Sequence, residues 1–233
     1  HNAAFYNCRK LKKLSVGTAI SGIGSDEFMN DSQLEHLIIR GKDSEATGLP
    51  LILERIAENI TVSFCPNSSS SPESIVFFPE YYEWLDEISP AHIFSRSIHG
   101  EGFRMRKSFE NGILNYRKYD SCLENALTVE SPESLCKIAL NRLRWPSRLE
   151  DIFREKYENV IKKYMGTAFT LAVKDQDFPM LQFICEHFSP DASALASAID
   201  QCIEKEWGEG NAFLIEAKHK SFSKKTFDFD LDF

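Results

Sequence analysis

Apolar residues recur every 23 positions between Phe5 and Val62. Four such columns are in register over three turns of the pattern: Phe5, Phe28 and Leu51; Leu11, Leu34 and Ala57; Leu14, Leu37 and Ile60; Val16, Ile39 and Val62. In each repeat the last positions alternate between apolar and polar, which is typical of a half-buried strand. A coil of this kind cannot bury its apolar face alone, so the columns predict stacked coils, that is, a short solenoid.

The remaining positions of the same strands point outward, onto the concave strand surface of such a solenoid. They are Lys13, Ser15, His36, Ile38 and Thr61. Ile38 is the one bulky apolar residue among them. Solenoids bind partners through their exposed strand surface, so these positions are the predicted binding face.

The amino-acid sequence of the repeats resembles the consensus of a known repeat type. Residues 4–11 and 23–28 are similar to the I-G-x-x-A-F-x-x-C-x-x-L unit of bacterial surface-antigen leucine-rich repeats. The third repeat departs from it, because residues 48–56 favour a helix that begins near Pro50. We expect residues 60–64 to be its strand, and residues 1–78 to be the terminal coils of a longer array.

The repeat pattern is not continued after Cys65. A serine run at 66–72 predicts a loop, and residues 74–78 predict a strand that closes the repeat sheet. Apolar spacing over 79–88 favours a helix that begins at Pro79. We expect residues 79–130 to be an irregular connecting region with helices.

One loop in this region has the composition of an anion site. Residues 99–107 combine two glycines with three cations, and the candidate ligands are His99, Arg104 and Arg106. The spacing of a P-loop is absent, and no dinucleotide fingerprint follows a strand. The alternative interpretation is a tight turn with solvated cations.

The second half predicts helices. Ser131 and Pro132 are typical of a helix start, and Trp145-Pro146 of its end. Apolar residues at helical spacing over 149–164 predict a further helix, capped by Ser147 and ended by Gly166. We expect residues 131–233 to form an α-helical domain.

From residue 167 onward the helices shorten into two successive pairs, 168–188 and 193–220, with a longer loop at 208–210 in the second. They resemble ankyrin-like helical pairs. The order of motifs along the chain also resembles leucine-rich repeat proteins of gut anaerobes that have an uncharacterised helical C-terminal domain. The motifs that carry this likeness are the repeats, Pro79-Glu-Tyr-Tyr, His99-Gly-x-Gly, Tyr116-Arg-Lys-Tyr-Asp, Leu143-Arg-Trp-Pro and Lys224-Lys-Thr-Phe. The predicted fold class is therefore α+β, a short leucine-rich repeat solenoid sheet followed by an α-helical domain.

The net charge and the spacing of the cysteines argue against some classes of partner, metal site and cofactor. A net charge of -8 argues against nucleic acid as a partner. The six cysteines form no C-x-x-C pair, so we expect free thiols, no metal and no cofactor. No apolar run is long enough to span a membrane. Together these features predict a cytoplasmic protein, with a signal peptide lost upstream of His1 as the alternative.

The sequence thus predicts a protein-protein interaction module, which binds a protein partner through the repeat face, the helical domain or both. No catalytic constellation is present, so we expect no enzyme. Two alternatives stay open. One is an enzyme or anion-binding protein that uses the 99–107 loop, and the other is a structural segment of a longer repeat protein. The oligomeric state is left open.

Overall fold

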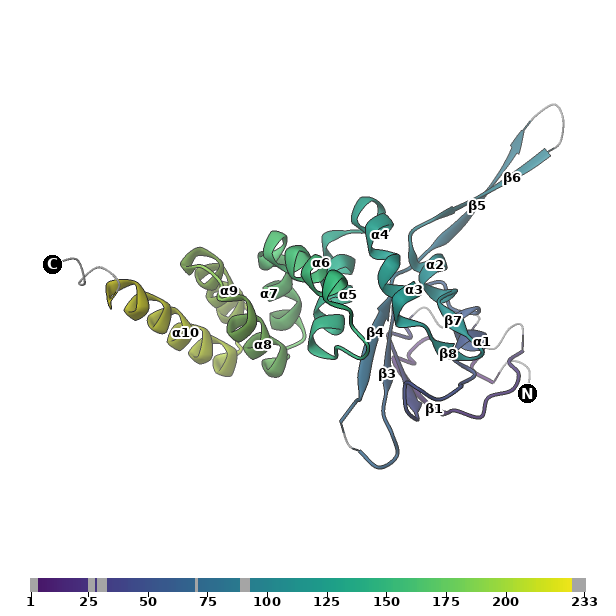
Figure 1. The fold of residues 1–233 in the computed structure, drawn as a ribbon, viewed down its shortest axis with the longest axis horizontal. Coiled ribbons are helices and arrows are strands. Elements are labelled where there is room, and N and C mark those ends of the chain that lie inside the picture. Colours follow the sequence, from purple (N-terminus) through teal and green to yellow (C-terminus); the bar gives the residue numbers. More distant parts are fainter. Residues whose placement is uncertain (1–3, 25–27, 29–32, 70, 89–92, 228–233) are drawn as a thin grey trace. The chain divides into compact units, whose positions relative to one another are not determined.

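The computed structural model describes residues 4–24, 28, 33–69, 71–88 and 93–227 (Figure 1). They form two compact units, His1–Arg154 and Glu155–Phe233. The first unit contains all the strands that the structure describes together with several helices, and the second contains helices. The prediction that helices and strands both build this chain is confirmed.

A four-stranded sheet is the centre of the first unit. Its strands lie in the order of the chain: β1 Lys13–Gly17, β2 His36–Arg40, β3 Ile60–Phe64 and β4 Ser74–Phe78. The first three are parallel, and β4 closes the sheet antiparallel to β3. Alternate residues of β2 and β3 are buried, as predicted for half-buried strands.

The register of the sheet follows the repeat spacing at first and then departs from it. Leu14 pairs with Leu37, as the columns predict, but Leu37 pairs with Val62 and not with Ile60. The prediction that Ile60 continues the column of Leu37 is therefore wrong, and the true partner lies two positions further along the chain. Side chains alternate with a period of two, so a slip of this size leaves the same set buried and the sequence pattern cannot detect it.

Two other features of residues 4–53 match the sequence pattern. The rings of Phe5 and Phe28, which belong to one column of the pattern, stack with their centroids 5.5 Å apart and their planes 12° from parallel. Helix α1 (Leu49–Leu53) begins beside Pro50, as predicted, and buries Leu49, Ile52 and Leu53. The coil that contains α1 is longer than the one before it, which accounts for the shifted pairing of β2 with β3.

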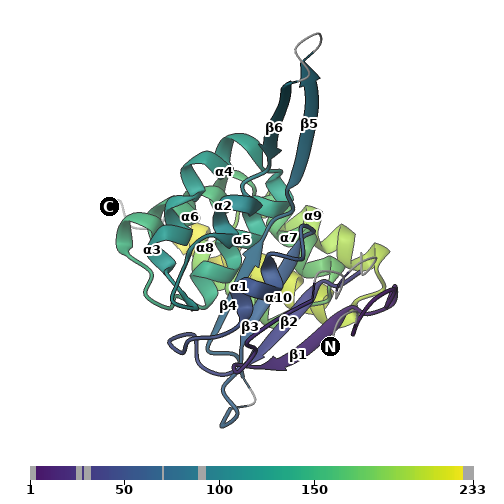
Figure 2. The same cartoon turned by 90° about the vertical axis from the view of Figure 1, so that its right-hand side faces the viewer.

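A two-stranded antiparallel ribbon follows the sheet. Its strands are β5 (Tyr82–Ile88) and β6 (Ile93–His99), paired in register from Tyr82 with His99 to Ile88 with Ile93. The ribbon extends away from the other elements of its unit in both views (Figure 1 and Figure 2). The prediction of a helix over 79–88 is wrong, because aromatic and β-branched residues favour strands when a neighbouring segment supplies backbone partners.

Short elements complete the first unit. They are α2 Gly102–Arg106, β7 Phe109–Glu110, β8 Ile113–Leu114, α3 Tyr116–Ser121, α4 Leu123–Val129 and α5 Pro132–Arg144. Asn111 and Gly112 have φ of 50° and 79°, which suits the tight turn between β7 and β8. Ser131 caps α5 by accepting the backbone N–H of Ser134, and α5 ends at Trp145, both as predicted. Helix α5 packs against β4.

Helix α6 (Asp151–Lys163) differs from its predicted limits at both ends. Ser147 does not cap it, because its hydroxyl donates a hydrogen bond to Asp43 instead. Gly166 does not end it either, since the helix stops before Tyr164, whose φ of -116° and ψ of 37° leave the helical region. Gly166 lies inside the next helix.

The second unit continues with α7 Met165–Lys174, α8 Phe178–Phe188, α9 Ala192–Glu204 and α10 Gly208–Phe227. The turns after α7 and α9 are alike. Gln176 and Glu206 both have positive φ, and the next residue in each turn donates its N–H to a carbonyl near the end of the preceding helix. The prediction of a loop at 208–210 is wrong, because these residues start α10, where a Cβ on Gly210 would lie 2.4 Å from the Trp207 ring. Within the described residues, every helix is too short or too polar to cross a membrane.

Candidate functional site

The predicted binding residues of the repeats lie on one face of the sheet. Lys13, His36 and Thr61 form one row of register partners across β1, β2 and β3, and Ser15 and Ile38 belong to the next row. Lys13, Ser15 and His36 are exposed, and Ile38 and Thr61 are half-buried. Three separate strands of the chain thus bring these side chains together.

Two further residues share this face and were missed. Ser63 completes the row of Ser15 and Ile38, and Arg40 stands two positions beyond Ile38. The Arg40 Nε donates a hydrogen bond of 2.9 Å to the Ser15 Oγ. Strand alternation alone would have found both residues. We call the whole set the outer sheet face: Lys13, Ser15, His36, Ile38, Arg40, Thr61 and Ser63.

The outer sheet face has a positive electrostatic character. It carries Lys13 and Arg40, and strands β1, β2 and β3 contain no Asp or Glu. The segments that lead into the three strands add exposed cations at Arg9, Lys10 and Lys12 and exposed acids at Glu35 and Glu58, so cations outnumber acids around the face. A ligand with negative charge therefore meets a favourable field at this edge of the unit.

The same face is covered where it continues onto β4. Phe77, the register partner of Thr61, is only 3% exposed, and the Lys137 ammonium of α5 lies 5.4 Å from the centroid of its ring. Ile75, the partner of Ser63, is half-buried. The exposed residues of this face thus lie on β1 and β2, and the face becomes more buried toward β4.

The glycines of the 99–107 segment have a structural explanation. Gly100 has a φ of 89°, and a Cβ there would lie 2.6 Å from the Glu80 carbonyl oxygen. A Cβ on Gly102 would lie 1.9 Å from the Pro79 carbonyl oxygen. Both glycines therefore permit a close approach of two backbones at the base of the ribbon.

Arg106 points into the protein. It is 4% exposed, and its Nε donates to the Ile56 carbonyl at 2.9 Å. Its Nη1 donates to the carbonyls of Pro79 and Gly102, and its Nη2 to that of Glu58. Burial lowers the pKa of this guanidinium to about 10. The side chain ties three segments together and is engaged by backbone carbonyls, so a ligand would have to displace them.

The other two candidates from this loop are held by different groups. The Arg104 Nη1 lies 3.2 Å from the Oε1 of buried Glu101. The His99 ring stacks on Tyr82, with centroids 4.9 Å apart. The structure therefore does not gather His99, Arg104 and Arg106 around one point, and the anion site remains a hypothesis that would depend on exposed Arg104 and His99.

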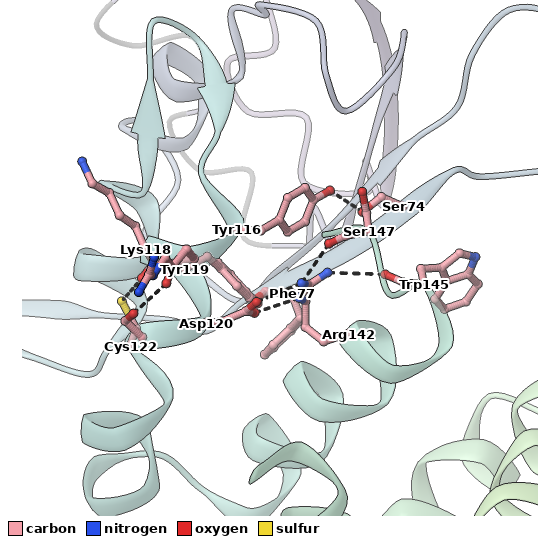
Figure 3. Close-up of polar contacts among 12 residues, drawn as sticks. Ser74, Phe77, Tyr116, Lys118, Tyr119, Asp120, Cys122, Arg142, Trp145 and Ser147 are labelled. Carbon is pink, nitrogen blue, oxygen red and sulfur yellow. Dashed lines mark hydrogen bonds and ion pairs between the residues drawn. The ribbon is translucent and has the colours of Figure 1, made fainter. Parts of the chain in front are cut away.

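Sequence reasoning did not find a buried polar cluster of the first unit. Arg142 of α5 and Asp120 of α3 are 0% and 1% exposed and form a bidentate ion pair, with N–O distances of 2.8 and 2.9 Å (Figure 3). Arg142 also donates to the carbonyls of Trp145 and Ser147, and its Cζ lies 4.4 Å from the centroid of the Tyr116 ring. These contacts satisfy a charge that would otherwise be costly to bury.

A second carboxylate extends this cluster to the sheet. Asp43, in the loop after β2, accepts a 2.8 Å hydrogen bond from the Tyr116 hydroxyl and another from the Ser147 hydroxyl. The Tyr116 oxygen lies 2.6 Å from the Ser74 Oγ of β4. Burial raises the pKa of Tyr116. We call Asp43, Ser74, Tyr116, Asp120, Arg142 and Ser147 the buried polar network.

The burial of the polar network favours a role in stability over contact with a substrate. All of its members except Ser147 are at most 2% exposed. They come from a loop, β4, α3, α5 and the segment after α5, so the network fixes the helices on the sheet. The sequence held one signal, since Tyr116, Asp120 and Ser147 lie in or beside motifs that carry the resemblance described above.

Two thiols and one histidine of the helices have structural surroundings. Burial raises the pKa of the Cys136 and Cys185 thiols to about 12, which makes them poor nucleophiles. His187 stacks on Phe183 and lies 3.4 Å from the Glu158 Oε1. Within the described residues, no three His, Cys, Asp or Glu side chains come together as metal ligands would.

Comparisons of the chain with protein-family models, with curated proteins and with solved structures found no match. Function is therefore inferred from geometry. Of the sites described above, the outer sheet face is the one that gathers exposed side chains from several parts of the chain.

Proposed function

We propose that this protein is a protein-protein interaction module whose outer sheet face binds an acidic segment of a partner protein. The observation that supports this most is the register of the sheet. Side chains from three strands, including every residue of residues 1–78 predicted to bind, form two adjacent rows on an exposed face. A binding surface needs such convergence, which here follows from the register that buries the alternate residues of the same strands.

Ile38 is the proposed anchor of this surface. It lies in one row between Ser15 and Ser63, so small polar side chains border it on both neighbouring strands. A half-buried apolar residue ringed by polar groups is the arrangement in which a partner side chain gains most from excluding water.

The charge of the face selects the partner. Lys13 and Arg40 flank Ile38 along the sheet, and no carboxylate stands in these three strands. An acidic segment gains attraction from both cations, and a basic one would be repelled. Because these cations are exposed, we expect the affinity to fall as ionic strength rises.

The repeats proposed for both units would suit a binding role. The regular step from β1 to β2 and the stacked pair Phe5 and Phe28 fit the proposed leucine-rich repeats. The two like turns at Gln176 and Glu206, which end the first helix of each successive pair, fit the proposed ankyrin-like pairs. Repeats of these kinds stack helices or strands into extended surfaces that bind other proteins.

The test compares partner capture by the wild-type chain and by Ile38→Asp. Proteins retained by each are quantified by mass spectrometry, and a partner retained by the wild type is then purified and titrated. We expect Ile38→Asp to weaken that binding by at least about tenfold, since it puts a charge at the proposed anchor. Ile203→Asp is the matched control, because Ile203 is 58% exposed and lies in the second unit.

A charge reversal sharpens the result. Lys13→Glu should weaken binding and reduce its salt dependence, as measured by titration at several ionic strengths. If the purified partner bound Ile38→Asp and Lys13→Glu with wild-type affinity, the outer sheet face would not be its site. Loss of binding in Ile203→Asp alone would move the interaction to the second unit.

A further inference from the structure

The ribbon of β5 and β6 exposes more large apolar side chains than any other element pair that the structure describes. Tyr82 is 59% exposed, Trp84 56%, Leu85 66%, Phe94 68% and Ile98 38%. A lone two-stranded ribbon is only marginally stable in water, and each of its strands has one edge without a strand partner in the described chain. This exposure indicates that the ribbon is completed by another strand.

The two edges of the ribbon are electrically different. Strand β5 carries three acids, Glu83, Asp86 and Glu87, whereas β6 carries none and has Arg96 at its centre. In a chain with a net charge of -8, two β5 edges would repel each other. The charge on the β6 edge is that of Arg96, and the Arg96 guanidinium forms an ion pair with Glu83 of its own ribbon.

The sequence of β6 is nearly symmetric about Arg96. Ser95 and Ser97 flank it, and Phe94 and Ile98 come next on either side. When two identical strands pair antiparallel about a two-fold axis, a residue before the centre meets the corresponding residue after it. A symmetric strand then places like beside like, with serine opposite serine and Phe94 opposite Ile98.

We propose that two copies of this chain associate through β6, antiparallel and with the two-fold axis at Arg96, to form a four-stranded sheet. The proposal uses the ribbon alone and leaves the outer sheet face free for its own partner. Across the ribbon, Leu85 pairs with Arg96, so Leu85, Phe94 and Ile98 lie on one face. Pairing through β6 places Phe94 of each copy beside Ile98 of the other, so two apolar patches form on this face, one on each side of the two Arg96 side chains.

The electrostatic cost of placing two Arg96 side chains at the two-fold axis is small. The two Arg96 side chains become neighbours, but each is held against Glu83 of its own ribbon, so two ion pairs rather than two bare charges meet there. Both are exposed to water, which screens the remaining repulsion. Pairing also supplies backbone partners to both β6 edges, which is the source of affinity when strands add to a sheet.

Sedimentation velocity of the full chain over a range of concentrations tests the association. We expect a concentration-dependent dimer, and we expect the double variant Phe94→Glu with Ile98→Glu to raise the dimer dissociation constant at least about tenfold. Trp84→Glu is the matched control. Trp84 is similarly exposed, but it lies on the other strand and the other face, so its replacement should leave the dimer nearly unchanged.

Disulfide capture tests the register. In the proposed dimer the two Arg96 Cα atoms lie about 4.5–5.5 Å apart, within the range of a disulfide. Arg96→Cys should therefore oxidise to a covalent dimer, with the bond identified by mass spectrometry of the peptide. Leu85→Cys is its counterpart on β5 and should not cross-link, because two strands separate the copies of Leu85 by about 14 Å in all. The wild type controls for the native cysteines.

Each outcome decides the proposal. A monomer at all concentrations overturns it, and so does a dimer that survives the Phe94 and Ile98 changes. Cross-linking of Leu85→Cys without Arg96→Cys would assign the contact to β5 instead. Equal weakening by Trp84→Glu would mean general apolar adhesion and would also overturn it. Circular dichroism of each variant checks that the remainder of the chain is folded.

Discussion

The buried polar network and the ribbon of β5 and β6 belong to the same unit and reverse the usual distribution of side chains. The network places charges where water is excluded, with Asp120 and Arg142 at most 1% exposed. The ribbon places Trp84, Leu85 and Phe94 in water, each more than half exposed. A buried charge needs polar partners, and an exposed apolar side chain needs an apolar surface to cover it. The two regions differ in where these partners lie.

In the network the partners are internal. Every charge described there meets a donor or acceptor from another segment, so the cluster fixes the helices on the sheet and gives the unit one arrangement. In the ribbon, the nearest residues of the chain leave large apolar areas uncovered, so completion has to come from outside. The comparison therefore predicts that changes in the network alter stability, whereas changes in the ribbon alter association.

The largest effect is expected from Arg142→Met. The change leaves the Asp120 carboxylate buried without its bidentate partner, which should lower the free energy of unfolding by about 3–5 kcal/mol. Chemical denaturation, with hydrogen exchange of α5 as the readout, measures this loss of unfolding free energy in the first unit.

The double variant Arg142→Met with Asp120→Leu is the control for that result. It removes both charges and keeps the volume apolar, so it should recover much of the lost stability. If Arg142→Met alone unfolded no more easily than the wild type, the ion pair would not stabilise the unit.

A pair of matched tyrosines tests the contrast directly. Tyr116→Phe removes the hydroxyl that lies between Asp43 and Ser74, and we expect it to cost about 1–2 kcal/mol of unfolding free energy. Tyr82→Phe removes a hydroxyl from a residue that is 59% exposed, and its cost should stay within about 0.5 kcal/mol. Equal losses in the two variants would contradict the assignment of stability to the network.

The smallest effect concerns a carboxyl at the base of the ribbon. Glu130 accepts the backbone N–H of Glu101, and burial raises its pKa. The folded state therefore holds this proton more tightly than the unfolded state, and stability falls as the pH rises from the unfolded pKa through the folded one. Glu130→Gln keeps an acceptor and should flatten this part of the pH profile, with slightly higher stability at neutral pH. A steeper acid-side profile in the variant would contradict the sign.

Local patterns predicted much of the fold. The alternation around Leu14 and Leu37 identified β1 and β2, and Ser131-Pro132 identified the start of α5, because both signals depend on neighbouring residues. The outer sheet face followed from the same alternation. These features need no knowledge of what lies far away in the chain.

The failures share one cause, which is that distant partners decided the outcome. Residues 82–88 have spacing that suits a helix, but pairing with 93–99 makes them a strand. Ser147 looked like a helix cap, but Asp43 takes its hydroxyl. The network itself joins residues from five segments, and no local pattern reveals that Asp120 and Arg142 meet.

The position of Asp43 in the chain also has a consequence for the order in which this unit folds. Asp43 and its partner Ser147 are 104 positions apart. On a ribosome that adds about 5–20 residues per second, Ser147 follows Asp43 by roughly 5–20 s. During that interval β1, β2 and β3 can pair while the Asp43 carboxylate stays hydrated. The buried polar network can therefore form only after Ser147 has been synthesised, so the helices are fixed on the sheet late in folding.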